Sequence, residues 1–133
     1  MFMAQRQFSA VQARYRAVDL SSRVEGASPH GLVMIMFDET LKAMDAMAAA
    51  MRRADVVQRG QKQVRTLNIL HGLETSLDHG RGGAIAADLS AVYRESRRLV
   101  LAAGRDNDPE PLAQARAMLG EIASAWEGIG SRP

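Results

Sequence analysis

The chain has 133 residues, 47% of them hydrophobic and 24% charged, which is typical of one soluble globular domain with its own core. Cysteine is absent, which excludes disulfides and thiol nucleophiles, and the net charge of only +2 makes the pI near 9.5 weak support for nucleic-acid binding. The sequence shows no signal peptide and no apolar run of the ~18 residues that a membrane-spanning helix needs. We therefore expect a cytoplasmic protein without membrane insertion.

The first predicted helix runs from about Arg6 to Leu20 and has a narrow apolar seam. Phe8, Val11, Tyr15 and Val18 recur at helical spacing, with polar residues on the other side. A helix this short is marginal alone in water, so the seam needs a partner surface. A polar connector follows over residues 21–27. We expect one domain over residues 1–133, in which residues 1–27 form a detachable N-terminal segment and connector.

The central predicted helix spans Ser28 to Met51. Ser28 is a good N-cap, and Pro29 suits the first helical position. The apolar residues that repeat every three to four positions are Val33, Met36, Phe37, Leu41, Met44, Met47, Ala48 and Met51. Five of the eight methionines lie between Met34 and Met51. Methionine is flexible, so this stripe fits either a bundle core or a groove that repacks around partners.

Two further helices are predicted over residues 57–77 and 84–103, separated by a glycine-rich loop at residues 79–83. In the first, one apolar line comprises Val64, Leu67, Leu70 and Leu77. In the second, the inward line comprises Ile85, Leu89, Val92, Leu99 and Ala103, and Gly104 is expected to end the helix. Arg94, Arg97 and Arg98 form a basic ridge, which we interpret as a solvated face with salt bridges rather than as a phosphate-binding surface.

The last predicted helix starts at Pro109 after the capping residue Asp108. Its apolar seam comprises Leu112, Ala115, Leu119, Ile122, Trp126 and Ile129. No segment has the alternating pattern of a strand. The predicted fold is all-α: an antiparallel up-down helical bundle of four long helices plus a short N-terminal helix.

Sites for chemistry are not apparent in the sequence. It has no Glu-x-x-His pair for a di-iron centre, and the stretch Asp106–Asp108 lacks the glycine and glutamate that complete an EF-hand. The stretch Gly80–Gly83 lacks the Lys-Ser/Thr of a P-loop. We therefore expect no enzyme activity, no catalytic residues, no metal or other cofactor, and no nucleic-acid partner.

The order of motifs resembles the family of flagellar secretion chaperones, FliS, from about Tyr15 to Ile129. The pieces that carry the resemblance are Ala27-Ser28-Pro29, Leu32, Met36-Phe37-Asp38, Leu89, Tyr93, Arg98-Leu99, Asn107-Asp108 and Ala125-Trp126. The resemblance implies a cytoplasmic chaperone that binds the C-terminal segment of flagellin, prevents its premature polymerisation and delivers it to the flagellar type III export apparatus. It leaves open whether the protein forms a homodimer.

On this basis we expect a client-binding groove lined by Leu32, Ile35, Met36, Met44, Met47, Leu67, Leu70, His71, Ile85, Leu89 and Tyr93. The N-terminal lid over it would carry Phe8, Val11, Tyr15 and Val18. Two alternatives stay open at this point. One is a small all-α adaptor for another protein or for itself, and the other is a basic helical nucleic-acid binder.

Overall fold

The computed structural model describes residue 20 and residues 22–130. Except for Leu20, the predicted N-terminal helix and the four lid residues therefore lie outside the described part of the chain. Residues 22–25 form a short helical segment that leads into the first long helix.

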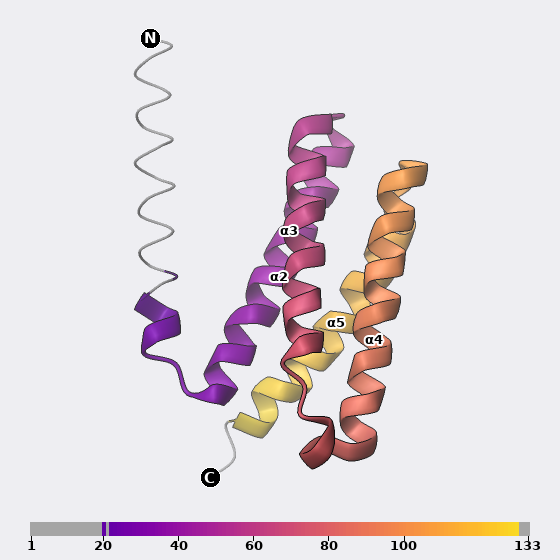
Figure 1. Ribbon diagram of the computed structural model, residues 1–133. Coiled ribbons are helices and arrows are strands. Elements are labelled where there is room, and N and C mark those ends of the chain that lie inside the picture. The colour runs from indigo at the N-terminus through magenta and orange to yellow at the C-terminus, as the bar shows by residue number, and fades with distance from the viewer. Residues whose placement is uncertain (1–19, 21, 131–133) are drawn as a thin grey trace.

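Four long helices make up the described fold: α2 (Pro29–Arg52), α3 (Val56–Thr75), α4 (His79–Asp106) and α5 (Pro109–Gly130). The connections between them are short, so consecutive helices run antiparallel (Figure 1). Helix α2 packs against α3 and α5, and α4 packs against the same two helices. The described residues contain no strand. The predicted all-α up-down bundle is confirmed.

The helix starts follow the expected capping chemistry. Ser28 accepts a hydrogen bond from the backbone N–H of Gly31 at 3.0 Å, and Pro29 is the first helical residue. Asp55 and Asp78 cap α3 and α4 in the same way. The predicted loop at residues 79–83 is wrong. Asp78 caps α4, so the helix already begins at His79, and it is interrupted only at Gly83, where φ is 52°.

The predicted end of α4 at Gly104 is also wrong. The helix continues to Asp106, and Asn107 caps it in the left-handed conformation with φ of 50°. Gly104 is instead a contact between helices. A side chain there would collide with Gln63 of α3, and the Gly104 carbonyl accepts a hydrogen bond of 2.8 Å from Arg59 Nη1.

The core lies along the centre of the bundle and draws on all four helices. Its large side chains with less than 2% of their surface exposed include Phe37, Met44, Met47, Leu70, Leu73, Val100 and Leu119. The Phe37 and Tyr93 rings pack at a tilt of 46° with centroids 6.4 Å apart. Trp126 packs against the edge of this core, stacks on the His30 ring at 4.7 Å and donates its Nε1–H to the His30 carbonyl. This pair joins the C-terminal part of α5 to the start of α2.

Three apolar residues that were predicted to face inward are exposed. Val64, Ile85 and Ile129 have 57%, 71% and 59% of their surface accessible. Helical spacing identifies residues on one line but leaves its angle to the core undetermined, and on α3 the buried positions are Thr66, Leu70 and Leu73. On α4 the buried positions near Ile85 are Ala86 and Ser90, so Ile85 lies beside the inner line of the helix and not on it.

Candidate functional site

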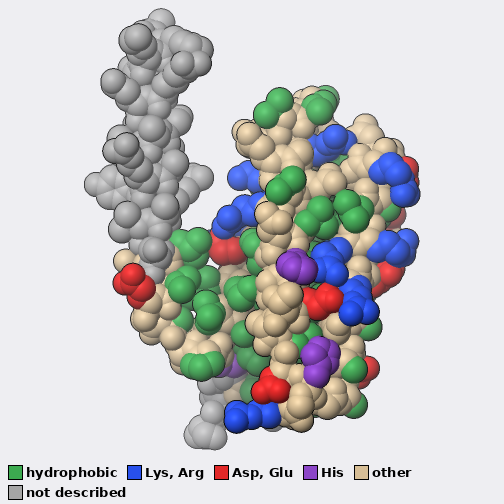
Figure 2. Space-filling model, in the orientation of Figure 1, with side chains coloured by type: hydrophobic (Ala, Val, Ile, Leu, Met, Phe, Trp, Pro, Cys, Tyr) green, Lys and Arg blue, Asp and Glu red, His purple; other side chains and the backbone are tan. Residues whose placement is uncertain are grey.

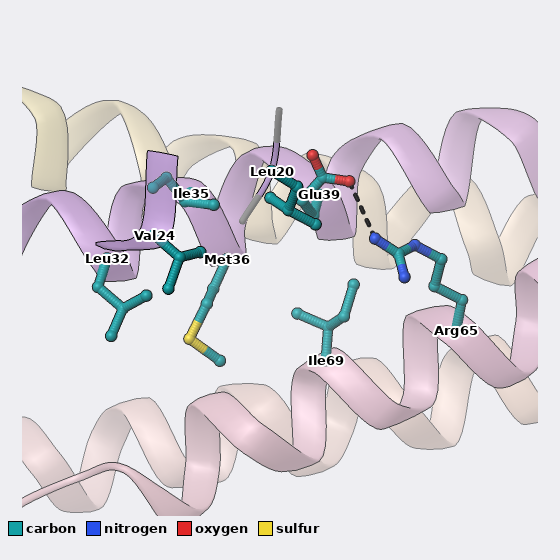
Figure 3. Close-up of a pocket in the computed structure, with 8 residues that line it drawn as sticks. All are labelled: Leu20, Val24, Leu32, Ile35, Met36, Glu39, Arg65 and Ile69. Atoms are coloured by element: carbon teal, nitrogen blue, oxygen red, sulfur yellow. Dashed lines mark hydrogen bonds and ion pairs between the residues drawn. The ribbon is translucent and has the colours of Figure 1, made fainter. Parts of the chain in front are cut away.

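An apolar pocket of about 170 Å³ lies between α2 and α3, near the start of α2 (Figure 3). Its apolar lining consists of Leu20, Val24, Leu32, Ile35, Met36 and Ile69. Glu39 and Arg65 complete the lining. A volume of this size can accept apolar side chains of a partner, and its lining offers them few polar groups.

Helical spacing brings the lining residues together. On α2, Ile35 and Met36 lie three and four residues after Leu32, and Glu39 follows them by four and three, so the four residues share one side of the helix. Ile69 lies on the facing side of α3. The glycine at position 72 leaves room for Met36, because a Cβ there would lie only 3.2 Å from the Met36 methyl group.

The connector before α2 forms the outer wall of the pocket. Leu20 and Val24 both line it, and Arg23 Nη2 lies 3.8 Å from Asp38 Oδ2 of α2. The connector covers the pocket only in part, because Val24 of the connector and Leu32 of α2 keep 41% and 39% of their surface exposed. The pocket is therefore an apolar site that its own chain covers only in part.

An ion pair spans the two helices at the polar side of the pocket. Arg65 Nη2 donates to Glu39 Oε2 at 3.1 Å (Figure 3). Lys42 Nζ lies 3.7 Å from the other oxygen of the same carboxylate. Two cations share one anion, so this side keeps a surplus of positive charge.

The structure brings together only part of the predicted groove. Leu32, Ile35 and Met36 line the pocket as expected. Five lining residues are not among those predicted from the sequence: Leu20, Val24, Ile69, Glu39 and Arg65. Ile69 is adjacent in sequence to Leu70 of the predicted apolar line, so the sequence pattern could have indicated it as a lining residue. The Glu39–Arg65 pair joins residues 26 positions apart, and nothing local indicates it.

Four predicted groove residues lie in the core instead. Met44, Met47, Leu70 and Tyr93 have between 0% and 2% of their surface exposed, so they do not line an open surface. Of the two interpretations of the methionine-rich helix, the core therefore applies to Met44 and Met47, while Met36 reaches the pocket. Burial raises the pKa of the Tyr93 phenol to about 12, which keeps it neutral at physiological pH.

The other predicted groove residues belong to different surfaces. Leu67 and Leu89 are partly buried against the core, and Ile85 is exposed on α4. His71 is exposed, with its Nδ1 3.1 Å from Arg97 Nη1. None of these four residues lines the pocket.

The basic ridge of α4 is a network of ion pairs, as predicted. Arg94 Nε and Arg97 Nη2 donate to the two oxygens of Glu74 at 2.8 and 3.0 Å, and Arg98 pairs with Glu95. The hydrogen bond from Arg94 is the largest influence on Glu74; together with the positive charges of Arg97 and Arg94, it lowers the pKa of this carboxyl despite partial desolvation.

Replacing Glu74 by glutamine is expected to lower the free energy of unfolding at pH 7 by about 0.5–1.5 kcal/mol, because two arginines lose their anion. The folded-state pKa of Glu74 lies below its unfolded value, so its stabilisation is present above the unfolded pKa and is lost as the pH falls through the folded pKa. Urea denaturation at pH 7 and pH 3 measures this. The gap between wild type and variant should narrow at pH 3; a constant gap would contradict an electrostatic origin.

Two further features of the described residues bear on function. Nowhere in residue 20 and residues 22–130 do three or more His, Asp or Glu side chains gather as a metal site would require. No helix in that part of the chain is long and apolar enough to span a membrane.

Comparison with known proteins gives the family. The model of the family described as flagellar protein FliS matches residues 11–133. The flagellar secretion chaperone FliS of Salmonella typhimurium is 34% identical over 119 residues, which cover 89% of this chain and 88% of that protein. The flagellar secretion chaperone FliSB of Pseudomonas aeruginosa is 29% identical over 116 residues, with 87% and 92% covered. FliS of Bacillus subtilis is 25% identical over 118 residues, with 89% and 86% covered. The chain therefore belongs to the FliS family of flagellar secretion chaperones.

Proposed function

We propose that this protein is a cytoplasmic export chaperone that binds the C-terminal segment of flagellin. In this role it prevents premature polymerisation of flagellin and delivers flagellin to the flagellar type III export apparatus. The main support is the apolar pocket between α2 and α3, together with relatives that are flagellar secretion chaperones. Its size and lining suit a segment that folds on binding and inserts apolar side chains between two helices.

The partly covered pocket fits a chaperone better than an enzyme. The lining contains six apolar side chains, while its two charged residues are paired with each other. Such a surface binds by removing apolar area from water, and its one carboxylate, Glu39, is already paired with Arg65 and Lys42.

The test is binding of purified flagellin, with and without its C-terminal segment, measured by isothermal titration calorimetry. Intact flagellin is expected to bind and the truncated form to lose measurable binding. Equal binding of both forms would overturn the proposal for the C-terminal segment. Absence of binding to either would favour the alternative of a small all-α adaptor for another client.

We also expect the N-terminal residues to regulate access to the pocket. Leu20 and Val24 already lie over it, so the chain before them starts at the edge of the apolar surface. The seam of Phe8, Val11, Tyr15 and Val18 requires an apolar partner, and the incompletely covered pocket offers one. A lid that competes with the client lowers the apparent affinity by the fraction of time that the site is closed.

Deleting residues 1–18 is expected to leave the bundle folded, because the buried core of the described residues comes from α2 to α5. It should also increase the fluorescence of an apolar dye and should not abolish client binding. Circular dichroism, dye titration and calorimetry measure the three effects, and Val11→Ala with Tyr15→Ala should show a weaker form of the dye effect. Unfolding of the truncated protein would contradict the lid, as would full protection of residues 1–18 from proteolysis both with and without client.

A further inference from the structure

A second apolar surface lies on the α3–α4 side of the bundle, away from the pocket. Val56, Val57, Val64 and Leu101 are four of the eight large hydrophobic side chains that the described part of the chain exposes. Three of them belong to the first half of α3, and Leu101 belongs to the second half of α4. Figure 2 shows apolar side chains gathered over these two helices in the upper part of the visible face.

The helix pairing shows that Val64 and Leu101 border the same junction. Arg97 of α4 contacts His71 and Glu74 of α3, which fixes the register of the two helices. Leu101 lies one turn after Arg97, and Val64 lies two turns before His71. Because the helices are antiparallel, both steps lead in the same direction along the bundle.

Open space separates the two valines of α3. Val57 and Val64 are seven residues apart, about 10 Å along the helix, and therefore share one side of it. Gly60 lies between them, and a Cβ there would have no atom within 4 Å. We call Val57, Gly60, Val64 and Leu101 the α3–α4 face. It presents three apolar side chains around a shallow gap, which is the spacing that an apolar helix stripe fills.

The charges around this face are mostly positive. No acidic residue occurs in α3 before Glu74. Five arginines of α3 and α4 occur with three carboxylates that pair with four of them, which leaves two positive charges in excess. The arginines are Arg59, Arg94, Arg97, Arg98 and Arg105, and the carboxylates are Glu74, Glu95 and Asp106. Asp55, two residues before Val57, is balanced by Arg53 at 3.5 Å. Basic side chains border the apolar patch in Figure 2.

We propose that the α3–α4 face is a docking site for an acidic amphipathic helix of a partner protein. The three apolar side chains would pack against the partner's apolar stripe, and its carboxylates would meet the surrounding arginines. A second copy of this chain fits less well, because two such faces would bring like charges together. Nucleic acid fits less well because the centre of the face is aliphatic and has no aromatic side chain on which a base could stack.

The test uses two synthetic helices of about 18 residues, or five turns, each with leucines at i, i+4 and i+7. One has glutamates beside the leucines and the other has lysines, and fluorescence anisotropy measures their binding to the full-length protein. The glutamate peptide is expected to bind at least about tenfold more tightly than the lysine peptide. Equal affinity of the two peptides, or no saturable binding of the glutamate peptide, would overturn the proposal.

Two variants locate the binding. Val64→Asp with Leu101→Asp should lower the affinity for the glutamate peptide at least about tenfold, since each substitution places a negative charge in the apolar contact. Ile85→Asp with Ile129→Asp adds the same charge at exposed apolar positions elsewhere and should change the affinity less than about twofold. Circular dichroism checks that both variants fold. Equal weakening in the two variants would overturn the location.

Two competing occupants are tested with the same variants. Sedimentation of the wild type that shows a dimer lost only in Val64→Asp with Leu101→Asp would assign the face to self-association and overturn the proposal. Binding of a labelled single-stranded oligonucleotide that is lost only in this variant would do the same in favour of nucleic acid. A monomer that leaves the oligonucleotide unbound supports the acidic helix.

Discussion

Replacing Phe37 by alanine is expected to lower the free energy of unfolding by about 3–5 kcal/mol. Phe37 is 1% exposed and packs on Tyr93, so the truncation leaves a cavity that the surrounding helices can fill only in part. Single domains have only about 5–15 kcal/mol of stability, which makes this a large share of the total. Urea denaturation followed by circular dichroism measures the change.

Leucine at the same position serves as the control. Phe37→Leu keeps most of the apolar volume and should cost less than about 1.5 kcal/mol if the core repacks. A loss below about 1 kcal/mol in Phe37→Ala would contradict the packing of Phe37 between α2 and its neighbours. Flagellin binding by the folded fraction of Phe37→Ala should stay near that of the wild type, because Phe37 does not line the pocket.

The bundle could be predicted from sequence because its signals are local. Ser28 and Pro29 start α2 through hydrogen bonding and a fixed φ within one turn, and Asp108 accepts a hydrogen bond from the Glu110 N–H at 3.0 Å, as its capping role predicts. The end of α4 could not be predicted in the same way. Glycine often follows the last residue of a helix, but Gly104 lies inside α4, where the absence of a side chain leaves room for Gln63 of α3. That close approach depends on the tertiary structure.

The pocket was only partly predictable because an apolar stripe has the same spacing whether it faces a core or a groove. Met36 and Met47 lie on the same methionine-rich helix, yet Met36 reaches the pocket and Met47 is fully buried. Their environments differ because the connector and α3 lie beside the first, while the other helices enclose the second. Sequence periodicity does not contain that difference.

The same limit explains the surfaces on α3. Val64 was assigned to the inner line, but the side of α3 turned to the core is set by Thr66, Leu70 and Leu73. The orientation of α3 about its axis has two consequences. Val64 is exposed on the α3–α4 face, and Ile69 lines the pocket on the α2 side. One helix therefore takes part in two separate apolar surfaces, with Arg65 beside the pocket and His71 beside α4.

Truncating two pocket residues, Leu32→Ala with Ile69→Ala, is expected to weaken flagellin binding about 30- to 140-fold. Each substitution removes side-chain area that the client would cover, worth about 1–1.5 kcal/mol, and about 1.4 kcal/mol corresponds to a tenfold change in affinity. Leu32 is exposed and Ile69 only partly buried, so the bundle should stay folded. Calorimetry gives the affinity, and thermal unfolding checks the fold.

The matched control is Ile85→Ala with Ile129→Ala, which removes exposed apolar side chains of similar size outside the pocket. Its affinity for flagellin should stay within about twofold of the wild type, because surface truncations away from a contact usually have small effects. Equal weakening in both double variants would show that general surface hydrophobicity drives the interaction. Unchanged binding in Leu32→Ala with Ile69→Ala, in a protein that still binds flagellin, would move the client site away from the α2–α3 pocket while leaving the chaperone function intact.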